Sequence, residues 1–226
     1  MILVSDPDTT HAGRNAHRLR ADAARNRERT LEAAAEVFAE QGLGATLNDV
    51  AHHAGLGIGT VYRRFPNKEA LIEALFENKV GEAVALATEA IGHPNAWDGW
   101  VTFLERMLHT QVCNKGLRDV LLHGPQGEDL AANFNRRMTP LVSELIGRCQ
   151  AEGSLRADFV AYDVPMLIAM IGAVADYTRD TDPQLWRRYF ALFVDGLATS
   201  RSSVSPLGAA PTARVVRQVM GRLRSA

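Results

Sequence analysis

The feature that most constrains this chain is a pair of very short helical segments separated by a glycine-containing turn. The first opens with T-L-N-D at residues 46–49, where Thr followed three residues later by an acid matches a capping box and predicts a helix over about 47–54. The G-L-G at residues 55–57 holds two conformationally permissive positions in three and predicts a tight turn. The second segment, residues 58–65, must end at Pro66, because the residue before a proline is pushed out of the helical region.

Helical periodicity extends through the rest of the chain. Apolar residues recur at spacings of three and four, and no alternating Val/Ile/Thr segment bounded by turn residues occurs, so the predicted fold class is all-α. A helix that begins near Asp22 and stops at Gly42 precedes the two short ones. Asn67 is expected to cap a long helix that runs to about Ile91. Further amphipathic helices are predicted at about 97–108, 130–146, 164–177 and 185–197. Pro140 predicts a kink or a break in its helix.

Two short helices joined by a glycine-containing turn, with a preceding helix to pack on both, describe a helix-turn-helix, whose second helix lies in the DNA major groove. In this chain the second helix leaves mainly Val61 and Phe65 to anchor it inward. Its other positions are small or polar: Gly57, Gly59, Thr60, Tyr62, Arg63 and Arg64. Small residues at the helix start allow the backbone to approach base edges. The donors expected to hold phosphates are Thr46, Thr60, Tyr62, Arg64 and Lys68.

Charge is unevenly distributed along the chain, although the net charge is only -1. Residues 14–30 hold six arginines and two acids, residues 80–200 hold 10 basic and 15 acidic side chains, and residues 201–226 hold five arginines and no acid. This pattern indicates that a polyanion is met at particular places. We predict a flexible basic arm over residues 1–19 and a mobile basic tail over 201–226, with the arginines of the first region following DNA backbone or entering the minor groove. A solvated arm is the alternative. The candidate contacts of this region are Arg18, Arg20 and Arg25.

The segment RTLEAAAEVFAEQGLGATLNDVAHHAGLGIGTVYRRFPNKEALIEALF, residues 29–76, resembles the DNA-binding domain of the TetR family of bacterial transcriptional regulators. The resemblance rests on the helix ending AEQG, the T-x-x-D-V-A start, the A-G turn, and G-T-V-Y followed by F-P-N-K-E. It implies that the residues facing bases are Gly57, Ile58 and Gly59, and that those facing phosphates are mostly Thr46, Thr60, Tyr62, Arg64 and Lys68. Family members often carry Ser or Thr in place of Gly57 and His in place of Arg64, so the resemblance does not carry over an operator preference.

The resemblance also implies a C-terminal all-helical ligand-binding domain and a homodimer whose last two helices form a four-helix bundle. The predicted domains are a helix-turn-helix domain at residues 20–66 and a ligand-binding and dimerisation domain at 67–200, in which residues 67–91 form the connecting helix. The helix at 164–177 is apolar nearly all round, and a partner subunit would cover its second side. A two-fold dimer predicts a near-palindromic operator, with recognition helices about one DNA turn, roughly 34 Å, or a related spacing apart.

The C-terminal domain offers candidates for a pocket and for a dimer interface. Aromatic and Met-rich helices can enclose a small apolar or mixed-polarity effector, although the same residues also suit a plain core. The pocket candidates are Trp100, Phe103, Leu104, Met107, Gln111, His123, Phe134, Met138, Met170, Val174 and Tyr177. Asn133 is a further polar candidate. The dimer-interface candidates are Met166, Ile171, Leu185, Tyr189, Phe193 and Leu197.

Other readings of these residues find little support. The glycines at 55–59 imitate a phosphate-binding loop, but no strand precedes them and the full G-x-G-x-x-G spacing is absent. His52 and His53 are adjacent and cannot form an i, i+4 metal pair, and no spacing joins the two cysteines with other histidines into a site. No metal or resident cofactor is predicted. The longest apolar run, residues 164–175, has 12 residues, well short of the roughly 20 that span a bilayer. The start MILVSDPDTT has no secretory pattern, so a cytoplasmic protein is expected.

Three classes of function remain to be compared. The first is a ligand-responsive transcriptional regulator, most simply a repressor, that binds a palindromic operator as a homodimer and is released by a small-molecule effector. The second is a helix-turn-helix adaptor that binds a protein and has no operator of its own. The third, an enzyme, is not expected, because no nucleophile elbow, paired-carboxylate motif or metal-binding spacing is present.

Overall fold

The computed structural model describes residues 8–113, 127–199, 212–215 and 217. Apart from turns and one isolated antiparallel bridge between Leu155 and Ala198, the regular structure of these residues is helical, which confirms the predicted all-α class. The chain divides into two compact units between Leu75 and Phe76. The boundary expected after Pro66 therefore falls short of the observed one, which lies within a helix.

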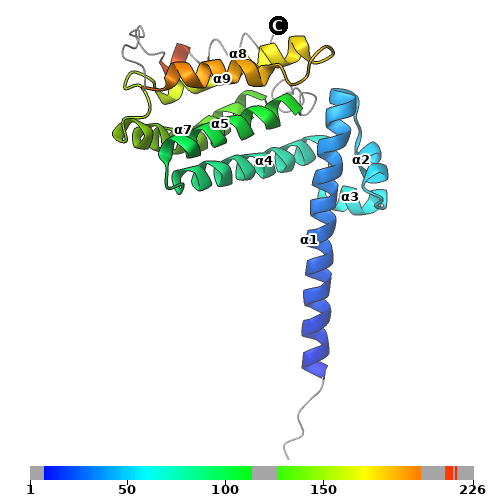
Figure 1. The fold of residues 1–226 in the computed structure, drawn as a ribbon. Helices are drawn as coiled ribbons and strands as arrows, with labels where there is room; N and C mark the ends of the chain where they lie inside the picture. Colours follow the sequence, from blue (N-terminus) through cyan, green and yellow to red (C-terminus); the bar gives the residue numbers. More distant parts are fainter. Residues whose placement is uncertain (1–7, 114–126, 200–211, 216, 218–226) are drawn as a thin grey trace, which may run out of the picture. The chain divides into compact units, whose positions relative to one another are not determined.

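The N-terminal unit contains α1 (Asp8–Gln41), the 3-10 turn η1 (Gly42–Gly44), α2 (Leu47–His53), α3 (Ile58–Arg64) and the start of α4 (Lys68–Ile91) (Figure 1). The two short helices lie beside the C-terminal half of α1. Fully buried side chains from all four helices form the core of this unit: Phe38, Val50, Val61 and Leu71. Helices as short as α2 and α3 are marginal in isolation, so their stability depends on this packing and on their caps.

Helix α1 begins earlier than the sequence pattern predicted. Its backbone is helical from Asp8, whereas the expected start was near Asp22. Residues 8–19, predicted as a flexible arm, are therefore helical, and residues 1–7 lie outside the described part. Residues 8–19 hold two Ala and two Arg beside Gly13, Asn15 and two Thr, which are weak helix formers, so neither intrinsic propensity nor an apolar face accounts for this extension. Most of the predicted tail, residues 201–226, also lies outside the description.

The start of α4 follows the predicted chemistry. Phe65 leaves the helical region, with φ -127° and ψ 95°, immediately before Pro66. The side-chain Oδ1 of Asn67 then accepts a hydrogen bond from the backbone N–H of Ala70 at 2.8 Å. The predicted end of α3 and the predicted cap of α4 are both confirmed.

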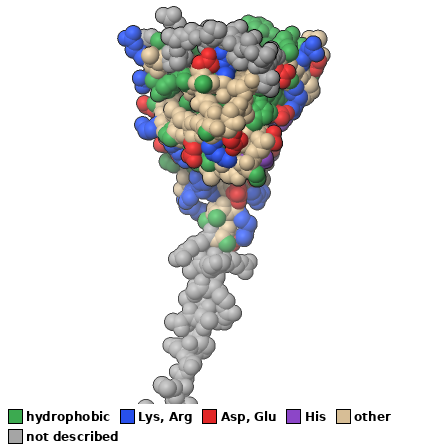
Figure 2. Space-filling view, turned by 60° about the vertical axis from the view of Figure 1, so that its left-hand side comes forward, with side chains coloured by type: hydrophobic (Ala, Val, Ile, Leu, Met, Phe, Trp, Pro, Cys, Tyr) green, Lys and Arg blue, Asp and Glu red, His purple; other side chains and the backbone are tan. Residues whose placement is uncertain are grey.

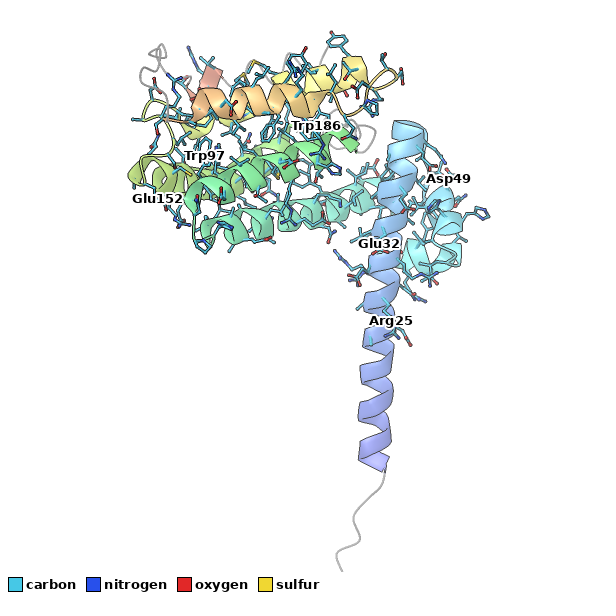
Figure 3. The ribbon with its side chains drawn as sticks, viewed as in Figure 1. Arg25, Glu32, Asp49, Trp97, Glu152 and Trp186 are labelled. Carbon is cyan, nitrogen blue, oxygen red and sulfur yellow. The ribbon has the colours of Figure 1, made fainter. Side chains whose placement is uncertain are left out.

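The C-terminal unit contains the rest of α4, α5 (Ala96–Cys113), α7 (Gly127–Ala151), the 3-10 turn η2 (Ala161–Asp163), α8 (Val164–Thr178) and α9 (Trp186–Leu197). Helix α5 packs against α7 and α8, and α8 packs against α9 (Figure 1). The centre of the core holds Trp100, Leu104 and Leu145, while Trp186 is buried at the start of α9 (Figure 3). Helix α7 continues through Pro140, so the alternative of a break there is wrong. No helix of the described part is long and apolar enough to cross a membrane.

Candidate DNA-binding surface and effector domain

The first short helix is fixed at its start by the predicted capping box. The side-chain oxygen of Thr46 accepts from the backbone N–H of Asp49 at 3.3 Å, and Asp49 Oδ2 accepts from the backbone N–H of Thr46 at 2.9 Å. The Thr46 hydroxyl also donates to the same carboxylate at 2.6 Å. These hydrogen bonds, the hydroxyl's first, lower the pKa of Asp49 below its ordinary value of 3.8. Asp49 is labelled in Figure 3. Thr46 and Asp49 together fix the N-terminus of α2, where Thr46 is a predicted phosphate contact.

The turn between the short helices uses the freedom of one glycine, not two. Gly55 has φ +61°, in the left-handed region that favours glycine. Gly57 has φ -62° and ψ 134°, an extended conformation that any residue adopts, and is the N-cap of α3. A Cβ built on Gly57 would meet only Thr60 Oγ1, at 3.9 Å, and one on Gly59 would meet nothing within 4 Å. Packing inside the chain therefore does not require glycine at either position, and their small size leaves the backbone open to an outside partner.

Helix α3 presents its predicted binding residues to solvent. Val61 and Phe65 are buried, as expected of its anchors. The exposed positions of this helix and its cap are Gly57, Ile58, Gly59, Tyr62, Arg63 and Arg64, and Thr60 is half-buried. Two large apolar side chains, Ile58 and Tyr62, are 42% and 46% exposed. The structure thus brings together, on α3 and its cap, the residues assigned to bases and three of those assigned to phosphates: Thr60, Tyr62 and Arg64.

The remaining DNA-binding candidates differ in their surroundings. Thr46 is exposed, whereas Lys68 is half-buried with its Nζ 5.6 Å from the centre of the Phe38 ring. Arg25 forms an exposed ion pair with Asp22. The side chains of Arg18 and Arg20 lie outside the described set.

One contact of this unit had no sequence signal. His53 Nε2 lies 2.6 Å from Glu36 Oε2 and links α2 to α1, across 17 positions of sequence. The sequence excluded a metal pair of His52 and His53 but predicted no partner for His53. Only the packing of α2 on α1 reveals its carboxylate partner.

The predicted pocket residues fall into two groups. Trp100, Phe103, Leu104 and Met138 are buried together in the core of the C-terminal unit, and Met107, Phe134 and Val174 are partly buried against it. Gln111 is half-buried, and His123 lies outside the described residues. Met170 and Tyr177 do not fit an enclosed pocket, because they are 51% and 90% exposed. These two assignments are corrected: helical spacing placed them on α8 but could not tell which side of α8 faces inward.

One buried polar atom within the described core has no hydrogen-bond partner. Trp100 is fully buried, and its Nε1 donates to no acceptor. The rings of Phe103 and Phe159 flank it at centroid distances of 6.2 Å and 6.0 Å. A buried donor without an acceptor costs about 1–3 kcal/mol.

The α8–α9 outer face is strongly apolar. We define it by Met166, Met170, Tyr177, Tyr189, Leu192 and Phe193, of which Leu192 is 59% exposed. Figure 2 shows apolar side chains reaching the surface near the top of the view, interrupted by charged ones. A hollow of about 330 Å³ between the two helices is lined by several of these residues. Ile171 and Leu197, predicted at the dimer interface, are instead buried in the core of their own unit, and Leu185 is half-buried.

A second, charged hollow of about 520 Å³ lies over α4, α5 and the start of α9. Its carboxylates are held in ion pairs, Glu89 with Arg106 at 2.9 Å and Glu105 with Arg187. None of the predicted pocket residues lines it. Its side chains come from three separate helices, so no spacing in the sequence could have shown it. No group of three His, Cys, Asp or Glu side chains in the described ranges could hold a metal ion.

Comparison with known proteins assigns both units. The family model "Bacterial regulatory proteins, tetR family" matches residues 31–75. The model "Transcriptional regulator SbtR-like, C-terminal domain" matches residues 95–199. The crystal structure of a TetR transcription regulatory protein from Mycobacterium vanbaalenii is 32% identical, with a TM-score of 0.64, over 80% of this chain and 99% of that one.

Two further relatives extend the comparison. The HTH-type transcriptional regulator SrpR of Pseudomonas putida is 29% identical over 124 residues, which are 54% of this chain and 57% of SrpR, so the match spans just over half of that regulator. FadR of Bacillus subtilis, solved in complex with stearoyl-CoA, shares the fold at 17% identity and a TM-score of 0.59, over 75% of this chain and 98% of FadR.

The helix-turn-helix and its exposed recognition face, together with these matches, define a DNA-binding regulator of transcription. The family is equally clear, because both domain models and a relative covered almost completely agree. The chain belongs to the TetR family of transcriptional regulators.

Proposed function

We propose that this protein is a ligand-responsive repressor that binds a near-palindromic operator as a homodimer and leaves it when a small molecule occupies the C-terminal unit. The observation that carries the proposal is the exposed face of α3, where small residues at the helix start adjoin Tyr62 and two arginines. In this arrangement Gly57, Ile58 and Gly59 approach base edges. The phosphates are held by Thr46, Thr60, Tyr62, Arg63, Arg64 and Lys68. The helical start of α1, with Arg18, Arg20 and Arg25, follows the DNA backbone.

The α8–α9 outer face is the proposed dimer interface. Exposed apolar patches rimmed by polar residues mark sites of association, and a two-fold pairing of α8 and α9 with their copies makes a four-helix bundle. Met166, Tyr189 and Phe193 keep the role that the sequence gave them. Met170 and Tyr177 join them, because their exposure suits an interface and not an internal pocket.

The effector site is proposed around Trp100, Phe103 and Met138, in the core of the C-terminal unit. The unpartnered Trp100 Nε1 supports an effector that is mostly apolar and carries at least one hydrogen-bond acceptor. The stearoyl-CoA bound by FadR indicates that this fold can accommodate a molecule with a long apolar part.

Coupling to DNA is assigned to α4, which continues from one unit into the other. Within the C-terminal unit, Glu77 on α4 accepts hydrogen bonds from Asn133 and Arg137 on α7, both at 2.8 Å. An effector that displaces α7 would therefore act on α4 directly. It lowers DNA affinity only if it binds better to the arrangement that fits the operator poorly.

Fluorescence anisotropy tests this proposal. The full-length protein is titrated into labelled duplexes from the region upstream of its own gene, with scrambled duplex as competitor and salt varied. Tight, competitor-resistant binding with two subunits per site supports the regulator. Binding that is equally weak for upstream and scrambled duplexes, together with a protein copurifying at fixed stoichiometry, would overturn it in favour of the adaptor.

A further inference from the structure

Arg29, near the middle of α1, reaches the far end of the first short helix. Its Nη2 donates to the backbone carbonyl oxygen of Ala54 at 2.6 Å, a bond that joins residues 25 positions apart. The sequence grouped Arg29 with the basic residues at 14–30, which were assigned as a set to DNA. Its geometry separates it from that set, because the guanidinium is engaged inside the N-terminal unit.

The carbonyl that Arg29 contacts lies at the C-cap of α2. Three earlier carbonyls of this helix end accept from backbone donors: Val50 O from Ala54 N, Ala51 O from Leu56 N and His52 O from Gly55 N, at 2.9 to 3.0 Å. The last carbonyls of a helix lack partners within it, and the negative end of the helix dipole favours a cation. Arg29 provides both a donor and a positive charge there.

The same guanidinium lies over the turn that leads to the recognition helix. A Cβ built on Gly55 would lie 3.5 Å from Arg29 Nη2, which shows how closely the side chain covers this residue. Gly55 is the left-handed residue of the turn, and α3 begins three positions later at Ile58. Arg29 thus holds α1, the end of α2 and the turn together, and the direction of α3 depends on that turn.

We propose that Arg29 is a positioning residue for DNA recognition: it fixes the turn between α2 and α3 against α1 and does not neutralise a phosphate. The proposal requires DNA binding, which the family establishes, but neither the dimer nor the effector. Arg64, exposed on α3, is the contrasting case of an arginine available to a phosphate. The two roles differ in salt dependence, since each phosphate neutralised contributes about 0.9 to the slope of log affinity against log salt.

Arg29→Ala and Arg64→Ala are compared with the unsubstituted protein by anisotropy at several salt concentrations, on upstream and scrambled duplexes. For Arg29→Ala we expect about tenfold weaker binding to the upstream duplex, a smaller loss on scrambled duplex, and an unchanged salt slope. For Arg64→Ala we expect weaker binding to both duplexes and a slope smaller by about 0.9 for each subunit bound. Arg29→Lys, which keeps a cationic donor, should recover most of the upstream affinity.

A purely structural effect is separated by two further measurements. Val37→Ala removes methyl groups from a buried side chain eight residues beyond Arg29 on α1 and destabilises the same unit while leaving the Arg29–Ala54 hydrogen bond in place. It should keep the unsubstituted ratio of upstream to scrambled affinity, whereas Arg29→Ala should lower that ratio. Amide exchange of the free protein should be faster at residues 55–58 in Arg29→Ala only. A slope reduced by about 0.9 for each subunit bound, with unchanged exchange, would make Arg29 a phosphate ligand. Unchanged affinity with unchanged exchange would remove its role.

Discussion

The exposed face of α3 and the α8–α9 outer face are both surfaces that the chain leaves uncovered, but their chemistry is opposite. Helix α3 exposes glycines, a tyrosine and two arginines, which suit a polar, charged partner. Helices α8 and α9 expose Met170, Tyr177, Tyr189 and Leu192, which suit a surface like themselves. The difference supports the proposed function, in which the N-terminal unit meets DNA and the C-terminal unit meets a second copy of the chain.

The two units are also stabilised differently. The short helices of the N-terminal unit depend on polar devices at their ends, namely the Thr46–Asp49 box and the cap from Asn67. The C-terminal unit depends on apolar packing between longer helices, with Trp100 and Trp186 among its buried side chains. Polar caps act at single residues, and one that includes a carboxylate, such as Asp49, responds to pH, whereas apolar packing is spread over many contacts.

The largest expected effect comes from charging the apolar face. Leu192→Glu places a carboxylate in the middle of the proposed interface, where it would be buried without a partner. We expect a monomer by analytical ultracentrifugation and operator affinity lower by about 100-fold or more, because a monomer reads a single half-site. Gln184→Glu adds the same charge at an exposed position before α9 and should change neither. A Leu192→Glu protein that remains dimeric would place the interface elsewhere.

A smaller effect is expected from the open glycine on the recognition helix. Gly59→Ala adds a methyl group that meets nothing within the chain and raises helix propensity, so the melting temperature should rise slightly. Affinity for the operator should nevertheless fall, by about tenfold, if the backbone here approaches base edges. Gly81→Ala is the matched control, since it is also helical, exposed and free of contacts. Gly81→Ala should raise the melting temperature by a similar amount and leave DNA affinity unchanged. Equal DNA affinities for Gly59→Ala and Gly81→Ala would contradict a close approach of DNA at Gly59.

A third test measures how the stability contributed by the capping box of the N-terminal unit depends on pH. Hydrogen bonds from Thr46 lower the pKa of Asp49 in the folded state, so its ionised form stabilises α2 above the unfolded-state value near 3.8, and this contribution is lost as the pH falls through the folded-state value. Asp49→Asn should therefore lower the melting temperature at pH 6, and its difference from the unsubstituted protein should shrink toward pH 3. In a Thr46→Val background the same substitution should have less effect. A pH-independent difference would show that the charge of Asp49 is not involved.

The sequence predicted the N-terminal unit in more detail than the C-terminal one. Capping boxes, positive-φ glycines and X-Pro steps are local, so the ends of α2, α3 and α4 could be placed from a few neighbouring residues. Packing of the helices brings together Arg29 with Ala54 and Glu36 with His53, and no local sequence pattern predicts such pairs. The early start of α1 was missed because residues 8–19 carry neither a marked apolar face nor a run of strong helix formers.

In the C-terminal unit the helices were predicted, but their faces were not. Helix α8 is apolar on nearly every side, so periodicity could not separate Ile171, which is buried, from Met170, which is exposed. Helical spacing therefore placed Met170 in the predicted pocket and Ile171 in the predicted interface, whereas the structure exposes Met170 and buries Ile171. An amphipathic helix such as α3 carries the direction of its inner face in its own sequence, whereas a uniformly apolar one takes it from its neighbours.

Cys149 allows the packing of the C-terminal unit to be measured with the least effect on function. Burial, and then the charge of Glu152, raise the pKa of this thiol from 9.0 to about 11. At pH 8 the thiolate fraction is then about 100-fold lower than that of an ordinary thiol, in addition to the shielding of the buried sulfur. In a Cys113→Ser background, a thiol reagent should modify the folded protein slowly and the protein in guanidinium at once, while DNA affinity matches that of the unsubstituted protein. Because modification requires the helices around Cys149 to separate, its rate measures the opening of this unit, and fast labelling of the folded protein would mean that this core is far looser than its packing indicates.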